Sequence, residues 1–313
     1  MPDLVLMPLS QGDRHQISGL MEEEEQAWMA DLGWDYGPIR KILTSYLDQN
    51  LLPGYAAACG GVIVGYTYFL VQREKGIIGS LFSREKEREI PRQVLAAAAR
   101  ALKETSSVRR IEAQILTRHS SHITDAFLEN GFEHHPRRYL ELDLTAVQPI
   151  EPAAGNNGVV RWQPNRLPGA AAVILEGYRN QADARICHDY GSVAGCESYL
   201  RSLIENPGCG DFLPEASFVG LDRGGNPAGL ILSSRISQGR AMIPQIAVRP
   251  DHQNRGLGRS LMGAAMAALR TLGFRSLTLT VTASNRRAFD WYGRLGFETR
   301  REFGAYVWMR SSA

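Results

Sequence analysis

Two segments of this chain, far apart in the sequence, follow the same order of residue types. Residues 126–144 read AFLENGFEHHPRRYLELDL, and residues 288–309 read AFDWYGRLGFETRREFGAYVWM. Both pass from Ala-Phe on a predicted helix through Gly-Phe and a basic turn to a β-rich ending. A repeat of this kind indicates that each half of the chain folds as a similar unit. The sequence therefore predicts two copies of one α/β unit.

The segment between the two halves has the composition of a linker. Residues 145–158 read TAVQPIEPAAGNNG, with two prolines, two glycines and few large apolar side chains. Such segments do not contribute to a packed core. We therefore predict a first domain over residues 1–147, a linker over 148–157 and a second domain over 158–313. A total of 313 residues suits two domains of ordinary size.

Hydrophobic periodicity and turn residues predict the same order of elements in both halves. In the second half, Asp222-Arg223-Gly224-Gly225-Asn226 forms a strong hairpin turn. The predicted elements there are a strand over 159–162, helices up to 180 and over 192–206, strands over 217–221, 228–237 and 240–248, a helix from 257, a strand over 276–282, a helix from 285 and a closing strand over 302–309. In the first half, the predicted elements are helices within 11–50, strands within 55–72, a strand over 76–82, a helix over 91–103, a strand over 108–116, a short helix ending at 131–132 and a closing strand over 139–144.

Composition places the chain among ordinary globular proteins. It is 44% hydrophobic and 22% charged, with a formal net charge of +2. This near balance does not favour a protein dedicated to nucleic acids or to anionic membranes. The sequence shows neither a run of about 20 apolar residues nor a secretory signal. Its four cysteines lack metal-site and disulfide spacing, so we expect a cytoplasmic protein without a metal.

The stretch HQNRGLGRSLM, residues 252–262, has two glycines one residue apart before a helical pattern. Such glycines often let the main chain approach a phosphate. A nucleotide P-loop requires Gly-Lys-Ser/Thr, but Arg259-Ser260 follows the second glycine. A dinucleotide fingerprint requires a third glycine, where this chain has Leu261, and an acid about 20 residues later. Both of these readings fail.

A third reading fits the residues. The stretch IPQIAVRPDHQNRGLGRSLM resembles the acetyl-CoA motif Q/R-x-x-G-x-G/A of the GNAT superfamily of N-acetyltransferases, with Gln253, Gly256 and Gly258 at its defining positions. A second family pattern, N-x-x-A-x-x-x-Y-x-x-x-G-F, is matched by Asn285, Ala288, Tyr292, Gly296 and Phe297. The close resemblance covers residues 241–309, and the order of elements extends it over the second half.

The resemblance implies the fold and the activity. It implies two tandem GNAT-like domains, each with a mixed, mostly antiparallel central sheet flanked by helices. The C-terminal domain is then expected to use acetyl-CoA as co-substrate and to transfer the acetyl group directly to a primary amine. The cofactor-binding residues implied are Ile246, Ala247, Val248, Gln253, Asn254, Arg255, Gly256, Leu257, Gly258, Arg259, Ser260, Asn285, Ala288 and Tyr292.

Physical chemistry agrees with this placement of the cofactor. The first N–H groups of a helix are unpaired and carry partial positive charge, which suits a diphosphate. Arg255 and Arg259 lie where they add charge-assisted bonds. By resemblance, the pantetheine arm lies in a gap between residues 245–248 and 277–282. A main-chain N–H near Ile246 or Val248 would there stabilise the oxyanion of the tetrahedral intermediate.

The reaction needs a proton donor and a proton acceptor. By resemblance, Tyr292 protonates the leaving thiolate, because Ala288 and Tyr292 share one helix face. Asn285 has two compatible roles, as a helix cap and as a cofactor contact. Many relatives carry a glutamate on a central strand as base, but residues 241–248 and 276–282 contain no acid. Water oriented by Gln245, and bases working through water at Asp211, Glu215 or His188, remain open.

The first half has lost the residues that define the motifs. Aligning the long helices places Glu89 and Pro91 where Gly256 and Gly258 stand. Glutamate repels a diphosphate, and proline has no N–H to donate. Phe127 falls opposite Tyr292, which removes the hydroxyl, and Ser120 falls near Asn285. The N-terminal copy is therefore predicted to be degenerate.

The acceptor is not encoded in any motif found in the chain. A small-molecule amine, an aminoglycoside-like sugar and a protein N-terminus all remain open, because a fold does not identify an acceptor. The layout, with an active second half and a degenerate first half, is similar to that of the mycothiol synthase family. The alternatives are an enzyme that uses a longer acyl-CoA and a non-catalytic acyl-CoA-binding regulatory module.

Overall fold

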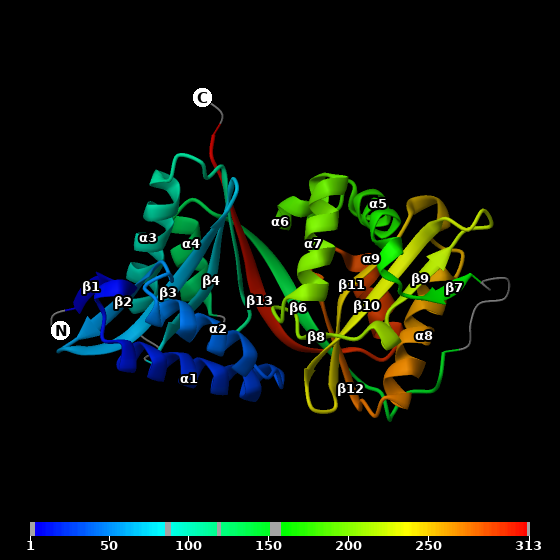
Figure 1. Cartoon of the computed structure of the whole chain (residues 1–313), viewed down its shortest axis with the longest axis horizontal. Coiled ribbons are helices and arrows are strands. Elements are labelled where there is room, and N and C mark those ends of the chain that lie inside the picture. The colour runs from blue at the N-terminus through cyan, green and yellow to red at the C-terminus, as the bar shows by residue number, and fades with distance from the viewer. Residues whose placement is uncertain (1–3, 85–88, 118–119, 151–157, 312–313) are drawn as a thin grey trace. The chain divides into compact units, whose positions relative to one another are not determined.

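The computed structural model describes residues 4–84, 89–117, 120–150 and 158–311 (Figure 1). Residues 151–157 of the predicted linker lie outside these ranges. The chain forms two compact units. Unit 1 consists of Met1–Arg137 and Glu302–Ala313, and unit 2 consists of Arg138–Arg301. None of the helices within the described ranges combines the length and the apolar character of a transmembrane span.

Unit 1 is an α/β structure whose strands are mostly antiparallel. The sheet order is β1-β2-β3-β4-β5-β13, and among the described residues of this unit only β4 and β5 pair in parallel. Its elements are β1 (Leu4–Pro8), α1 (Arg14–Leu32), α2 (Gly37–Asp48), β2 (Gly54–Cys59), β3 (Val62–Gln72), β4 (Lys75–Ser83), α3 (Glu89–Glu104), β5 (Arg110–Ile115), α4 (Ser121–Glu129) and the end of β13 (Glu298–Met309).

Unit 2 has the same kind of sheet, in the order β6-β12-β11-β10-β9-β7, with the short β8 beside β10. β11 and β12 pair in parallel, and β10 pairs antiparallel with β11, β9 and β8. Its elements are the end of β6 (Glu133–Asp143), β7 (Val159–Arg161), α5 (Leu167–Tyr178), α6 (Ala182–Ile186), η3 (His188–Gly191), α7 (Val193–Glu205), β8 (Asp211–Phe212), β9 (Phe218–Leu221), β10 (Pro227–Ser237), β11 (Arg240–Val248), α8 (Leu257–Thr271), β12 (Ser276–Thr282), α9 (Arg286–Arg294) and the start of β13.

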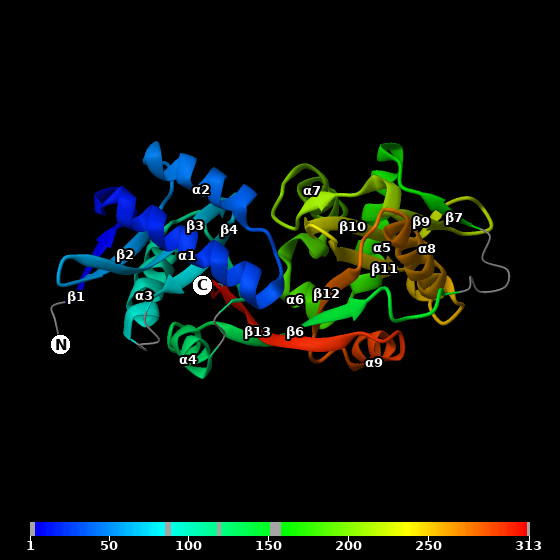
Figure 2. The same ribbon diagram turned by 90° about the horizontal axis from the view of Figure 1, so that it is seen from below.

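Helices cover both faces of the unit 2 sheet (Figure 2). Apolar residues of α8 and α9 form one core with β11 and β12, around Leu261, Met266 and Leu279. Apolar residues of α5 and α7 form a second core on the other face, around Ile174 and Leu200. The long strand β10 contributes to both cores because successive side chains point to opposite faces. The cores hold the ends of β11, α8 and α9 in place, and these ends carry the predicted motifs.

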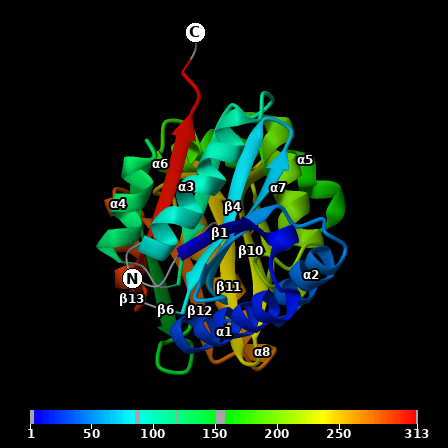
Figure 3. The same cartoon turned by 90° about the vertical axis from the view of Figure 1, so that its left-hand side faces the viewer.

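The two closing strands do not stay with their own halves. Residues Gly304–Met309 of β13 pair antiparallel with Arg110–Ile115 of β5, so this segment lies within unit 1. Figure 3 shows the red end of β13 beside α3 and α4 of that unit. Leu140 and Leu142 of β6 are buried in the unit 2 core that contains α8. The sequence analysis assigned each strand to its own half. The alternation of apolar side chains predicts that one face is buried, but it carries no information on which sheet edge supplies the partner.

The compact units therefore divide the chain at residues 137 and 301. These positions do not coincide with the sequence-based borders at 147 and 158. Several short elements were also not predicted, namely β1, α6, η3 and β8. All of them are five residues or fewer, which is too short for a periodic pattern to stand out.

Candidate functional site

The two central strands of unit 2 separate along their length. β11 and β12 pair from Arg240↔Ser276 to Ile243↔Leu279, and the described residues contain no further pair between them. Pro244 follows at once and has no N–H to offer a neighbouring strand. The register between β10 and β11 also shifts at this level, as at a β-bulge. The structure thus contains a gap where the resemblance implied one, but only beside residues 280–282 of β12, because residues 277–279 are paired with β11.

The edge of β11 that faces this gap offers N–H groups. In an antiparallel pair, alternate residues direct their backbone groups toward the partner strand. Arg249 donates its backbone N–H to Ala228 of β10 at 2.8 Å, so Ala247 and Gln245 also face β10 in this register. Ile246 and Val248 consequently direct their N–H and C=O groups away from β10, toward the gap.

Side chains engage the two carbonyl groups on that edge. The Tyr178 hydroxyl donates to the carbonyl oxygen of Ile246 at 3.0 Å. The Gln253 side-chain amide donates to the carbonyl oxygen of Val248, also at 3.0 Å. The edge therefore presents mainly donors to the gap. Such an edge suits carbonyl groups and a developing oxyanion.

The loop after β11 leads into an uncapped helix. Gly256 occupies the N-cap of α8 with φ of 85°, a left-handed conformation that favours glycine, and no side chain caps the helix. The N–H of Ser260 bonds the carbonyl of Gly256 at 2.9 Å, as in a regular first turn. The N–H groups before Ser260 have no earlier helical carbonyl within reach. The start of α8 is therefore a ready site for an anion.

Gly258 leaves space at the same place. A Cβ built on it would lie 3.7 Å from Val248 Cγ2 and 3.9 Å from the Trp291 ring. These are ordinary contact distances, so the protein itself does not require glycine there. The missing side chain instead opens the main chain of the first helical turn to a ligand.

Arg287 of α9 holds the loop from the opposite side. One terminal nitrogen of its guanidinium donates to Gln253 Oε1 at 2.9 Å, and the other donates to Asn254 Oδ1 at 2.8 Å. Asn254 has a φ of 60°, which asparagine tolerates better than most residues. The two bonds connect the loop to α9, although the residues are more than thirty positions apart in the sequence.

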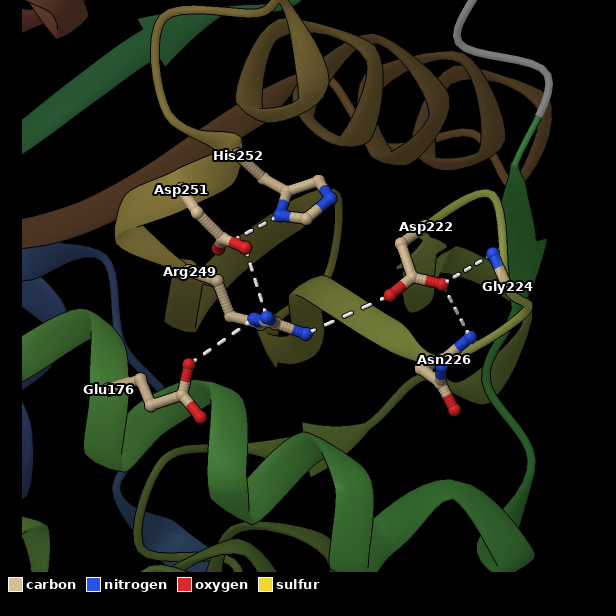
Figure 4. A network of polar contacts seen from close by, with 7 residues as sticks. All are labelled: Glu176, Asp222, Gly224, Asn226, Arg249, Asp251 and His252. Carbon is tan, nitrogen blue, oxygen red and sulfur yellow. Dashed lines mark hydrogen bonds and ion pairs between the residues drawn. The ribbon is translucent and has the colours of Figure 1, made fainter.

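An ion-pair network holds the beginning of the loop (Figure 4). Arg249 contacts Glu176 of α5 at 3.2 Å, Asp251 at 3.0 Å and Asp222 of the β9–β10 turn at 3.8 Å. His252 lies 2.9 Å from Asp251. The contact with His252, and then the charge of Arg249, lower the pKa of the Asp251 carboxyl. One guanidinium thus connects α5, the hairpin turn and the segment that leads to Gly256.

These elements enclose a cleft of about 450 Å³. It lies along the β11 edge and ends at the start of α8, and none of the aspartates and glutamates that the structure describes lines it. The lining residues are Gly177, Tyr178, Gln181, Ile246, Ala247, Val248, Gln253, Asn254, Gly256, Gly258, Arg259, Asn285, Arg287, Ala288, Trp291, Tyr292 and Arg294.

Most residues named from the motifs line this cleft, and three do not. Leu257 and Ser260 are 4% exposed and belong to the interior side of α8. Arg255 is exposed and lies outside the cleft lining. The helical period explains the first two, because residues 257, 260 and 261 share the face of α8 that packs on the sheet.

Six of the lining residues were not predicted from the sequence. Gly177, Tyr178 and Gln181 come from α5 and the residues after it, which no motif connects with the loop. Their position depends on packing of α5 against β11. The other three are Arg287, Trp291 and Arg294 on α9, which follow the spacing i, i+4, i+7 and lie next to the face of Ala288 and Tyr292. That spacing is a signal in the sequence that finds them.

Tyr292 lies in the wall of the cleft with its side chain 6% exposed. Burial, and then the negative charge of Asp183, raise the pKa of Tyr292 above the ordinary tyrosine range. Its hydroxyl makes no hydrogen bond to another residue in the described ranges. It is thus a protonated donor over the whole neutral range. The capping role predicted for Asn285 is confirmed, since its side chain accepts from the N–H of Ala288 at 3.2 Å.

None of the candidate bases named from the sequence lines the cleft. Asp211 is exposed and pairs with Arg235 at 3.2 Å, while Glu215 and His188 are exposed. Gln245 is buried, and its Oε1 accepts from the Tyr190 hydroxyl at 2.8 Å.

Another acid lies beside the cleft. Asp183 of α6 accepts a hydrogen bond from the Thr282 hydroxyl at the end of β12, at 2.7 Å. Its negative charge contributes to the raised pKa of Tyr292, which lines the cleft. The sequence analysis did not predict α6 and therefore did not consider this carboxylate.

In unit 1, the position aligned with Tyr292 is part of the core. Phe127 is completely buried and stacks on Tyr306, with ring centroids 3.8 Å apart and planes 4° apart. Pro91 lies in the first turn of α3, where it provides no N–H. Residues 85–88, which precede α3, lie outside the described ranges. At this position Phe127 therefore packs in the core of unit 1.

Comparison with known proteins agrees with the motifs. Residues 189–297 match the model of the acetyltransferase (GNAT) family. A mycothiol acetyltransferase of Streptomyces bingchenggensis is 37% identical over 101 residues, which is 32% of each chain. The [ribosomal protein bS18]-alanine N-acetyltransferase of Salmonella typhimurium is 47% identical over 57 residues, 18% of this chain and 38% of that protein. The matches thus span well under half of these relatives' lengths.

Solved structures extend the likeness to the whole fold. A GCN5-related N-acetyltransferase from Sphaerobacter thermophilus has a TM-score of 0.69 at 14% identity, covering 100% of this chain and 98% of that one. A tandem GNAT protein from the clavulanic acid biosynthesis pathway has a TM-score of 0.63 at 16% identity, covering 99% and 100%. The predicted fold class is confirmed. Residues 189–297 thus match the acetyltransferase (GNAT) family, and the chain as a whole shares its fold with a tandem GNAT protein.

Proposed function

We propose that unit 2 is an acetyl-CoA-dependent N-acetyltransferase that transfers an acetyl group directly to a primary amine. The observation that carries the proposal is the continuous line of donors in the cleft. The N–H groups of Ile246 and Val248 face the gap, and the uncapped start of α8 lies at its end. Coenzyme A has the matching chemistry, with amide carbonyls along its pantetheine arm and a diphosphate beyond them.

In this proposal, the protein contributes position and charge. The first turn of α8 and Arg259 hold the diphosphate. The N–H groups of Ile246 and Val248 hold the pantetheine arm and the oxyanion that forms when the amine attacks. The C–N bond forms, the C–S bond breaks, and the Tyr292 hydroxyl supplies a proton to the departing sulfur. Asp183 is the carboxylate best placed to accept the proton of the amine through water.

The acceptor is proposed as a class only. By their names, one relative is a mycothiol acetyltransferase and the other acetylates an alanine of ribosomal protein bS18, so both a small-molecule amine and a peptide N-terminus fit as acceptors. None of the described acids lines the cleft, which favours binding of the anionic acetyl-CoA there. In this proposal, the acceptor amine approaches from another side of the gap between β11 and β12.

The test measures the release of free thiol from acetyl-CoA in the presence of a panel of amines. The panel includes amino sugars, cysteine-bearing amines and peptides with free N-termini. We expect thiol release that depends on one class of amine, with a mass increase of one acetyl group on the acceptor. Tight binding of acetyl-CoA without thiol release from any amine supports the regulatory module instead. A preference for a longer thioester in a thermal-shift series supports a different acyl donor.

Gly177 provides a further prediction for the cleft. A Cβ on this residue would lie 3.3 Å from the carbonyl oxygen of Val248 and 3.5 Å from Ala247 Cβ, so a larger side chain must extend into the cleft. We expect Gly177→Leu to weaken acetyl-CoA binding about tenfold, or about 1.4 kcal/mol, measured by calorimetry. Gly19→Leu is the control, because Gly19 also lies within a helix and has nothing within 4 Å. Equal affinity of Gly177→Leu and the native protein contradicts the placement of the ligand.

A further inference from the structure

Three tyrosines pack together on the face of the unit 2 sheet that α5 and α7 cover. They are Tyr178 at the end of α5, Tyr190 of η3 and Tyr199 of α7. The rings of Tyr178 and Tyr190 stack with centroids 4.6 Å apart, and the Tyr199 ring meets the Tyr190 ring edge-on at 5.2 Å. Tyr190 is buried and contacts both of the other rings, so it joins three helical segments behind β11.

Two of these tyrosines hold neighbouring residues of β11. The Tyr190 hydroxyl donates to Gln245 Oε1 at 2.8 Å. The Tyr178 hydroxyl donates to the carbonyl oxygen of Ile246 at 3.0 Å. Both β11 residues follow Pro244, where the strand leaves β12 and its register with β10 shifts. A strand that leaves a partner also leaves the hydrogen bonds that fix its peptide planes, and the two side chains provide support at that place.

The peptide plane between Gln245 and Ile246 carries the N–H group of Ile246, which faces the gap. The two tyrosine contacts flank this plane, one on the Gln245 side chain and one on the Ile246 carbonyl. Val248 is the next residue to face the gap, and its Cγ2 lies 3.7 Å from the Cβ position of Gly258. Two residues of a strand span about 7 Å, so Ile246 lies farther from the proposed diphosphate site. Its N–H is therefore the donor nearer to the acyl group in the proposed complex.

Stability does not explain the choice of glutamine at position 245. Gln245 is 2% exposed, and within the described residues its Nε2 has no hydrogen-bond partner. A buried amide with an unmatched N–H destabilises a fold, whereas an apolar side chain of similar size has no such cost. Local violations of this kind are typical of functional sites. The amide oxygen, which Tyr190 holds, is the part that an apolar residue cannot supply.

We infer that Tyr190 and Gln245 are positioning residues for acetyl transfer, which orient the peptide plane before Ile246 so that its N–H meets the oxyanion. The inference rests on the proposed function, and it assigns the oxyanion to this N–H and not to that of Val248. Neither side chain lines the cleft, so both act through the main chain of β11. The oxyanion develops only as the amine attacks. The positioning therefore contributes to the rate of transfer and not to the affinity for acetyl-CoA.

The experiment compares the native protein with Gln245→Leu, Tyr190→Phe and the double variant, by single-turnover thiol release and by calorimetry with acetyl-CoA. Loss of a whole oxyanion donor typically slows a reaction about 10²–10³-fold, so we expect a displaced donor to slow it about tenfold. Acetyl-CoA affinity stays within about twofold in all three variants. Because both single substitutions remove the same hydrogen bond, the double variant is also slower by about tenfold and not by about hundredfold.

Thermal unfolding separates positioning from packing. Replacing both partners of a buried hydrogen bond by apolar groups of similar shape is nearly neutral for stability. The double variant is therefore expected to keep the native unfolding temperature although it is slow. Tyr139→Phe is the matched control, since Tyr139 is another buried tyrosine of unit 2 and lies on β6, which β12 separates from β11. It is expected to keep the native rate.

A native rate in the double variant overturns the inference, and so does a loss of affinity equal to the loss of rate. Additive losses in the double variant also overturn it, because the two residues then act separately. The same holds if thermal stability falls together with the rate, or if Tyr139→Phe is slowed as much. Absence of thiol release by the native protein with every amine contradicts the proposed function itself, which distinguishes the two failures.

Discussion

Replacing Gly256 with glutamate is expected to lower the affinity for acetyl-CoA more than about hundredfold, or about 3 kcal/mol. Gly256 forms the N-cap of α8 and lines the cleft at the proposed diphosphate site. The new side chain blocks the approach to the first helical turn and places a negative charge beside the anion. Its φ of 85° adds backbone strain to any residue other than glycine. Calorimetry with acetyl-CoA measures the change.

A matched substitution separates strain from loss of the site. Gly273 follows the same helix at its other end, has a φ of 84° and is surrounded by open space. Gly273→Glu therefore introduces the same charge and a similar backbone strain away from the cleft. We expect it to reduce thermal stability about as much as Gly256→Glu while acetyl-CoA affinity stays within about twofold. Unchanged affinity in Gly256→Glu contradicts the assignment of the loop.

Replacing Tyr292 with phenylalanine is expected to reduce the rate of acetyl transfer about hundredfold, with little change in acetyl-CoA affinity. General acid catalysis typically contributes this much. The phenylalanine fills the same buried volume, so the core formed by α8 and α9 is preserved. Single-turnover measurement of thiol release, with an amine that the panel identifies, gives the rate. A parallel loss of affinity and rate indicates that Tyr292 acts through packing.

The pH profile supplies an independent readout. Because the pKa of Tyr292 is raised in the folded protein, its hydroxyl keeps its proton as the pH rises from 7 to 10. The factor between the native protein and Tyr292→Phe should therefore stay constant across this range. If the ratio of the two rates becomes smaller as the pH rises toward 9, the Tyr292 hydroxyl has lost its proton in the native protein. That outcome contradicts the role of Tyr292 as proton donor. Tyr306→Phe is the control, since it removes a hydroxyl that contacts Thr124 in unit 1.

Much of the fold was predictable because its patterns are local. β11 and β12 have the predicted bounds, 240–248 and 276–282, since apolar residues alternate there and turn residues bound them. For the same reason, the turn residues Pro250 and Gly273 predicted where β11 and α8 end. The loop between β11 and α8 was predicted from Gln253, Gly256 and Gly258. The short helix α6 was not predictable, so Asp183 was missed.

The sequence by itself determined the repeat, the order of the long elements and the position of the two motifs, because side-chain period, turn chemistry and glycine placement act over a few residues. The tertiary structure alone decided which sheet edge receives each closing strand, since a strand pattern specifies a buried face and not a partner. It also decided that Gly177 and Tyr178 face the β11 edge, and that Arg249 meets Glu176 and Asp222. Such contacts join distant segments through packing and charge, and no short stretch of sequence encodes them.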